Sequence, residues 1–148
     1  MPNLKKTLIK KGYIKIPIVI TKSNHLEVFA KINNVEGRFI LDTGASNTCV
    51  GIDKIDFFNL ISKESEIKAA GAGATDMKTM VSKKNTLKIG KWKNKKQQIV
   101  VFDLSHVNIA LEAHDALPVD GILGADILIQ SKAYIDYAKQ SLYMKKKK

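Results

Sequence analysis

Apolar residues recur at every second position in several short segments of this 148-residue chain, and this spacing restricts the fold more than any other feature. Alternation of apolar and polar residues is typical of a strand with one buried face. We therefore expect a mainly β fold. Two successive segments each place four apolar residues on one strand face: Ile14, Ile16, Ile18 and Ile20, then Leu26, Val28, Ala30 and Ile32.

A hairpin is predicted directly after the second of these segments. Residues 33–37 read Asn-Asn-Val-Glu-Gly, a composition typical of a tight turn. The run Phe39-Ile40-Leu41 that follows is continuously apolar, which predicts a strand buried on both faces. Further strands are expected over 48–50, 98–102, 132–137 and 141–145, and a long hairpin over 66–90 with its tip at Gly71-Ala72-Gly73-Ala74.

One helix is predicted over about residues 54–61. Asp53 can accept hydrogen bonds from its first backbone N–H groups. The spacing of Ile55, Phe58 and Ile61 would place these side chains on one buried face.

The chain has no internal repeat and no Pro/Gly/Ser-rich linker. Residues 1–148 are therefore expected to form one domain with a core over about 13–144, a short N-terminal extension and a lysine-rich C-terminal tail. A second short helix is expected to begin near Gly124. The stretch 103–118 is expected to be irregular.

The net charge of +11, from 25 basic and 14 acidic residues, raises the question of a nucleic-acid partner. Arg38 is the single arginine, and arginine is the residue that makes bidentate contacts to bases and phosphates. Aromatic residues do not alternate with the lysines as they would in a base-stacking surface. We therefore expect no nucleic-acid partner and interpret the lysines as solvated strands, turns and tail.

Cys49 is the single cysteine, which excludes a disulfide framework and a cysteine-rich metal site and is typical of a reducing compartment. The N-terminal region lacks the apolar stretch of a signal peptide. The apolar run 14–20 contains Lys15 and Pro17 and is too short to span a bilayer. The expectation is a soluble cytoplasmic protein without a membrane partner.

The segment Asp42-Thr43-Gly44-Ala45-Ser46 places a carboxylate at the end of the predicted buried strand. Gly44 allows a backbone path that a Cβ atom would obstruct, and the Thr43 hydroxyl can bond to a neighbouring loop. An ordinary Asp/Gly turn is the alternative interpretation. A second motif, Ile122-Leu123-Gly124 with a helix after it, could pack beside the carboxylate loop and shield it.

These motifs, in this order, resemble the retropepsin-like aspartic proteases, the single-domain relatives of pepsin. The resemblance covers Phe39 to Ser46, the hairpin tip 71–74 and Ile122-Leu123-Gly124. The continuation through 125–128 and 133–137 is more similar to bacterial and cellular members than to viral ones. Viral members carry an arginine where this chain has Ala125.

The resemblance implies a closed, barrel-like β fold, a flap hairpin and a homodimer. Asp42 would be the catalytic acid and base, Thr43 would interlock the two active-site loops, and Gly44 would orient the carboxylates. Gly71, Ala72, Gly73 and Ala74 would form a flap over a peptide or protein substrate. Ile122 is a candidate for an apolar subsite wall.

The chemistry itself requires a second chain. Peptide hydrolysis needs a base to activate water and an acid to protonate the carbonyl oxygen, and two close carboxylates that share one proton supply both. The chain contains no second Asp-Thr-Gly or Asp-Ser-Gly, so a symmetric dimer would provide the partner carboxylate. The prediction is an aspartic endopeptidase without a cofactor. A catalytically silent binding or dimerisation module of the same fold is the alternative.

Other catalytic constellations are weaker. Glu112, His114 and Asp115 lie close in sequence, but their spacing matches no established zinc motif, so no metal is expected. Cys49 is interpreted as a buried apolar residue rather than a nucleophile. The glycine-rich segment 71–74 lacks the Lys-Ser/Thr ending of a phosphate-binding loop.

Overall fold

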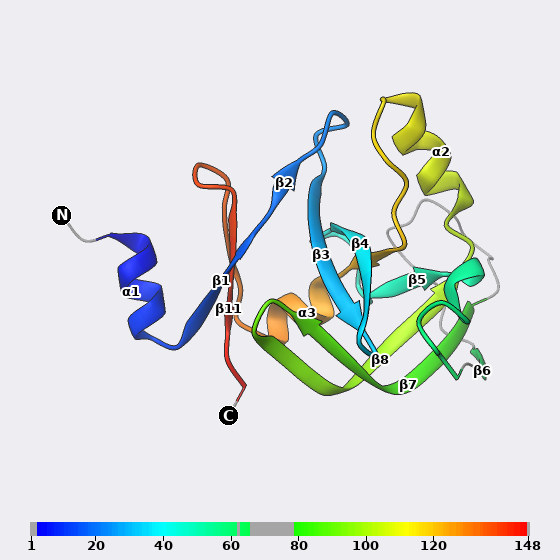
Figure 1. The fold of residues 1–148 in the computed structure, drawn as a ribbon, viewed down its shortest axis with the longest axis horizontal. Coiled ribbons are helices and arrows are strands. Elements are labelled where there is room, and N and C mark those ends of the chain that lie inside the picture. Colours follow the sequence, from blue (N-terminus) through cyan, green and yellow to red (C-terminus); the bar gives the residue numbers. More distant parts are fainter. Residues whose placement is uncertain (1–2, 62, 66–78, 148) are drawn as a thin grey trace.

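The computed structural model describes residues 3–61, 63–65 and 79–147, and its elements are drawn in Figure 1. The strands among these residues are β1 (Tyr13–Pro17), β2 (Val19–Ile20), β3 (Leu26–Ile32), β4 (Val35–Leu41), β5 (Cys49–Gly51), β6 (Lys63–Ser65), β7 (Thr79–Ile89), β8 (Trp92–Phe102), β9 (Gly121–Leu123), β10 (Tyr134–Asp136) and β11 (Ser141–Lys145). The helices are α1 (Leu4–Lys10), α2 (Ser105–Ala113), α3 (Ala125–Gln130) and the 3₁₀ turn η1 (Ile52–Lys54).

The larger sheet closes on itself. Its strand order is β2-β3-β4-β9-β5-β8-β7-β6, and a further pairing joins β3 to β7. Six strands from β3 to β7 therefore form a closed barrel, as predicted. Three α-helices lie in the described part of the chain, whereas one or two short helices were expected from the sequence. None of the described helices is long and apolar enough to cross a bilayer.

The smaller sheet has the order β1-β11-β10 and lies between the barrel and helix α1 (Figure 1). The last strand, β11, is central and pairs antiparallel with β1 and with β10. This confirms the two closing strands expected near 132–137 and 141–145. The first helix, α1, was not predicted from the sequence. Its Leu8 packs against Tyr13 and Tyr143 and so anchors α1 to this sheet.

The hairpin between β3 and β4 turns at Asn33 and Asn34, which have φ angles of 51° and 69°. Two consecutive positive φ values fit the right-handed twist of paired strands, and asparagine tolerates them better than most residues. The turn fixes a register in which Leu26 pairs with Leu41. The predicted hairpin is confirmed.

The barrel interior is filled by apolar side chains from nearly every strand. Phe39, Ile40 and Leu41 are 0%, 4% and 5% exposed, so this run is buried on both faces as predicted. Each fully buried side chain of this size contributes about 1.5–3 kcal/mol relative to an exposed one. Other members of the main core are Ile32, Leu87, Ile89, Trp92, Ile99, Val101, Leu123 and Ile127.

The expectation of an irregular segment over 103–118 is wrong in its first half, because α2 covers Ser105–Ala113. The N-cap residue, Leu104, makes no side-chain hydrogen bond to the first turn. Instead, the Asp103 carboxylate accepts a hydrogen bond of 2.8 Å from the Ser105 N–H. Hydrogen bonds from Ser105 lower the pKa of Asp103. Leu111 is 2% exposed and anchors the helix.

The predicted helix over 54–61 is also wrong in form. The segment begins with η1, and Asn59 has a φ of 55°, which ends any helical path. Phe58 is buried as expected, but Ile61 is 84% exposed. Leu60 takes the buried position instead, at 7% exposure.

Strand β8 begins at Trp92, well before the strand predicted over 98–102. Trp92 is 1% exposed, and its indole N–H donates to the Lys145 carbonyl oxygen over 3.1 Å. The lysines that follow Trp92 point outward and obscured the alternation in the sequence. Of the hairpin predicted over 66–90, the structure describes the second arm, which is β7. This strand pairs antiparallel with β6, which lies just before the predicted range.

Candidate active site

Asp42 follows directly after β4, at the point where that strand lies parallel to β9. Ile40 pairs with Ile122 and Leu41 with Leu123. The Asp42 N–H donates to the Leu123 carbonyl oxygen over 2.9 Å. The two motifs that the sequence suggested would meet are therefore joined by backbone hydrogen bonds.

The Asp42 carboxylate is oriented by its own loop. The Gly44 N–H donates to Asp42 Oδ1 over 2.8 Å, and the Ala45 N–H donates to the Asp42 carbonyl oxygen over 3.2 Å. A Cβ atom at Gly44 would lie 3.3 Å from Asp42 Oδ1, so glycine allows this close approach. Asp42 is half-buried, whereas Thr43 and Gly44 are exposed.

Helix α3 holds the far side of the loop, and it begins after Gly124 as predicted. The Ala125 N–H donates to the Ala45 carbonyl oxygen over 2.7 Å. A Cβ atom at Gly124 would lie 2.8 Å from the oxygen of Ala45 and from backbone atoms of Asn47. Only glycine fits at this contact between the two motifs.

A polar connection that the sequence did not indicate fixes the end of the loop. Thr48 donates to Asp126 twice, from Oγ1 to Oδ1 over 2.8 Å and from its N–H to Oδ2 over 3.0 Å. The Gly124 N–H donates to Thr48 Oγ1 over 3.1 Å, and Gln97 Nε2 donates to Asp126 Oδ2 over 3.2 Å. Asp126 thereby joins the loop to α3 and to β8.

The only available signal for this connection was indirect. Asp126 follows Gly124 closely, and Thr48 stands in a segment predicted to be a short strand beside apolar Cys49 and Val50. A hydroxyl in such a segment needs a hydrogen-bond partner. Nothing in the local pattern identified a partner so distant along the chain.

An apolar cluster lies beneath the carboxylate loop. It consists of Ala45, Cys49, Val100, Phe102, Leu104 and Ile122, with Val107 of α2 packed against it. Ile122 is 4% exposed in this chain, so its contact with a substrate stays a prediction. Val107 also packs against a second cluster that contains Ile40 and Leu111. Helix α2 therefore covers the strands that present Asp42.

Cys49 is free and buried, which confirms its interpretation as an apolar packing residue. Burial raises the pKa of its thiol to about 12, and the nearby carboxylates of Asp126 and Asp42 act in the same direction. The thiol is therefore protonated near neutral pH. A nucleophilic cysteine needs the opposite shift.

The remaining sequence candidates divide into exposed and undescribed residues. Glu112, His114 and Asp115 are all exposed on or after α2. Within the described residues, no group of three or more His, Cys, Asp or Glu side chains is arranged to hold a metal ion. The flap residues Gly71, Ala72, Gly73 and Ala74 lie outside the described residues.

Comparison with known sequences assigns the family. The sequence model of the family described as "Aspartyl protease" matches residues 28–127, which include both the Asp42 loop and the start of α3. The chain belongs to the aspartyl protease family. No curated protein sequence matches it.

Solved structures show the same fold. A retropepsin-like aspartic protease from Rickettsia conorii matches with a TM-score of 0.61 and 23% identity, over 90% of each chain. EIAV protease, complexed with the inhibitor HBY-793, matches with a TM-score of 0.52 and 21% identity, over 76% of this chain and 92% of that one. The retroviral protease-like domain of Ddi1 from Leishmania major matches with a TM-score of 0.56 and 15% identity, over 81% and 87%.

Proposed function

We propose that this chain is an aspartic endopeptidase in which two Asp42 carboxylates, one from each subunit of a homodimer, activate a water molecule. The observation that carries the proposal is the placement of Asp42. Its carboxylate lies half-buried at the end of β4, in a loop fixed by Leu123 and Ala125, within a chain of the aspartyl protease family. A surface turn would need no such anchoring.

The need for two subunits follows from the proton count. One carboxylate cannot be ionised to accept a proton from water and protonated to donate one to the substrate at the same time. Two carboxylates held close together repel when both are ionised, so the pair keeps one proton. This chain offers one Asp-Thr-Gly segment, and a two-fold axis beside it would bring in the second.

The exposed residues of the loop suit such an axis. Thr43 and Gly44 are exposed in the single chain, next to the half-buried carboxylate. The Thr43 hydroxyl would bond to the partner's loop, and the Gly44 N–H would keep the Asp42 carboxylate in one orientation.

In the proposed reaction the ionised carboxylate takes a proton from the bound water, and the oxygen of that water attacks the peptide carbonyl carbon. The protonated carboxylate gives its proton to the carbonyl oxygen, which produces a neutral gem-diol. When the C–N bond breaks, the nitrogen takes a proton from the carboxyl group that was protonated by the water and leaves as an amine. The other carboxylate takes a proton from one hydroxyl of the gem-diol, which becomes the carbonyl group of the new carboxylic acid. The shared proton is restored, and no metal or organic cofactor takes part.

Substrate binding would use the predicted flap hairpin, whose two arms would lead from β6 and back to β7. An extended peptide can add to such a hairpin as a further strand. Gly71, Ala72, Gly73 and Ala74 would form its covering tip and exclude water on closure. Ile122 would contribute to an apolar subsite wall.

The smaller sheet limits how two copies can pair. Strand β11 has β1 on one side and β10 on the other within the same chain, so its own edges are already used. A dimer that extends this sheet would pair through the outer edge of β1 or β10.

The test compares wild type with Asp42→Asn on a fluorescent, unstructured protein substrate across acidic to neutral pH. The proposal predicts cleavage by wild type and loss of at least about a hundredfold in the variant. Cleavage that the variant retains would contradict the role of Asp42. A folded wild type that cleaves nothing would favour the silent binding module.

A further inference from the structure

A row of lysines crosses the outer face of the barrel at the end of β4 opposite Asp42. Lys31 of β3 pairs with Lys88 of β7, and Lys88 pairs with Lys93 of β8. On its other side Lys31 pairs with Glu36 of β4. All four side chains are exposed, so three adjacent strands present ammonium groups side by side.

This arrangement is unfavourable for folding by itself. Like charges directly opposite each other on neighbouring strands destabilise a sheet. Among residues 3–61, 63–65 and 79–147, the ion pairs are Arg38–Glu27 and Lys54–Asp120, so none of the three row lysines has one. Glu36 opposite Lys31 offsets part of this charge, and the three lysines with one glutamate keep the row net positive, which attracts a partner of opposite charge.

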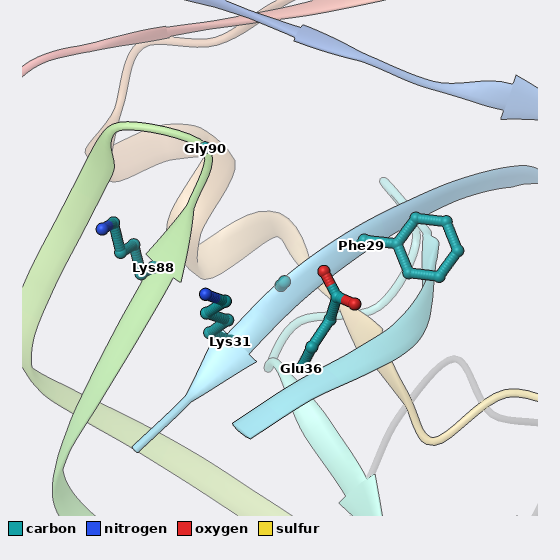
Figure 2. A pocket seen from close by; sticks show the side chains of 6 residues that line it. Phe29, Lys31, Glu36, Lys88 and Gly90 are labelled. Atoms are coloured by element: carbon teal, nitrogen blue, oxygen red, sulfur yellow. The ribbon is translucent and has the colours of Figure 1, made fainter. Parts of the chain in front are cut away.

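A hollow lies beside Lys31 and Lys88, at the end of the row nearer to Glu36. It has a volume of about 230 Å³ and is lined by Phe29, Ala30, Lys31, Glu36, Lys88 and Gly90. Figure 2 shows Lys31 between Lys88 and Glu36, with Phe29 beyond Glu36. A water molecule occupies about 30 Å³ in the liquid, so the hollow has room for one acidic side chain.

The hairpin that carries Lys88 and Lys93 is basic along its whole length. From Thr79 to Phe102 the sequence contains no aspartate or glutamate. Its lysines are Lys83, Lys84, Lys88, Lys91, Lys93, Lys95 and Lys96, and all of them are exposed. The hollow therefore opens onto an extended positive surface.

We propose that this lysine row and its hollow form a docking site for an acidic segment of polypeptide. One carboxylate would enter the hollow between Lys31 and Lys88, and further carboxylates would follow the row toward Lys93. The site is distinct from the catalytic one. Glu36 precedes Asp42 by six residues of a strand that rises about 3.3 Å per residue, which separates them by about 20 Å.

An acidic polypeptide fits these residues better than a nucleic acid or a membrane. The row has no arginine for bidentate contacts to phosphates or bases, because the neighbouring Arg38 is already engaged with Glu27 over 3.1 Å. The Arg38 guanidinium also lies 5.3 Å from the centre of the Phe29 ring, so one face of that ring is already covered. A hollow sized for a side chain is of no use to a flat bilayer.

The test measures fluorescence anisotropy of a labelled oligo-glutamate peptide bound to the full chain carrying Asp42→Asn, so that cleavage cannot interfere. Lys31→Gln with Lys88→Gln should weaken binding by about fivefold or more. The matched control, Lys22→Gln with Lys139→Gln, removes the same charge from exposed sites elsewhere and should change binding by less than about twofold. Added salt should weaken the wild-type interaction.

Equal weakening in both double variants would overturn the proposal, because net charge alone would then explain binding. So would undiminished binding without Lys31 and Lys88. A single-stranded oligonucleotide or an anionic vesicle that binds more tightly than the peptide, through the same lysines, would overturn the assignment of the partner. Because the readout is binding, the result does not depend on whether the chain hydrolyses peptides.

Discussion

Thr48 and Asp126 are joined by two hydrogen bonds, of 2.8 Å from the hydroxyl and 3.0 Å from the backbone N–H, although 78 positions separate them. Thr48 is fully buried, and its hydroxyl also accepts from the Gly124 N–H. The Thr48 hydroxyl thus bonds the Gly124 N–H of the second motif and the Asp126 carboxylate of α3. The carboxylate loop is positioned by this contact as well as by the strand before it.

Thr48→Val should test that role, because valine keeps the shape and removes the hydroxyl. The Gly124 N–H and one Asp126 oxygen would lose a partner, so we expect a loss of about 1–3 kcal/mol in the free energy of unfolding. Urea denaturation measures it. Thr48→Ser, which keeps the hydroxyl, is the control and should retain most of the stability. Equal losses in the two variants would contradict the account.

Gly124→Ala probes the contact between the helix start and the loop. The added Cβ would lie 2.8 Å from backbone atoms of Ala45 and Asn47, which are not free to move aside. We expect destabilisation of about 1–3 kcal/mol and a displaced Asp42 loop. Thermal unfolding and peptide cleavage should both be measured. Wild-type values in both assays would show that the helix is not held against the loop as described.

Cys49 makes stability depend on pH in the alkaline range. Its folded-state pKa is raised to about 12, whereas an unfolded thiol loses its proton near 8.5. The buried thiol thus favours the folded state fully below the unfolded value, and this contribution is lost as pH rises from there toward 12. Between those values Cys49→Ala should remove a slope of up to about 1.4 kcal/mol per pH unit.

The measurement is urea denaturation of wild type and Cys49→Ala at several pH values from 7 to about 10.5. The tyrosines whose pKa values are also raised by burial, Tyr13 and Tyr143, are present in both proteins and cancel in the comparison. Parallel pH profiles for the two proteins would contradict the burial of the thiol. Rapid labelling of native Cys49 by a thiol reagent would do the same.

The sequence was most informative where structure is decided locally. The Asn33-Asn34 turn, the buried run Phe39–Leu41 and the helix start at Gly124 all depend on residues close in the chain. The prediction for 103–118 could have included a helix, since Leu104, Val107 and Leu111 have helical spacing. No N-cap side chain marks the start of α2, however.

The rest depended on distant contacts. No local pattern shows that β9 enters between β4 and β5, and that placement is what brings Leu123 to Asp42. The Thr48–Asp126 pair and the lysine row arise from strand order and register in the same way. The beginning of β8 was missed because Lys93 and Lys95, although alternating with buried Trp92 and Asn94, made the segment resemble a solvated turn.

Lys88→Glu should stabilise the fold by about 0.5 kcal/mol at low salt. The substitution places an acidic residue between Lys31 and Lys93 and replaces two repulsive cross-strand pairs by attractive ones. Thermal unfolding at low and high ionic strength measures the effect, which should shrink as salt is added. Lys22→Glu is the control for net charge. A destabilised Lys88→Glu protein would mean that the lysines do not face each other.

The most direct test of the central claim mixes wild type with Asp42→Asn at a constant amount of wild type, after joint unfolding and refolding to exchange subunits. If each active site needs one Asp42 from each subunit, equal amounts of the variant should lower the cleavage rate to about half, and a ninefold excess to about a tenth. A rate that stays constant at every ratio would show that one chain acts alone, and the proposed shared pair would be wrong.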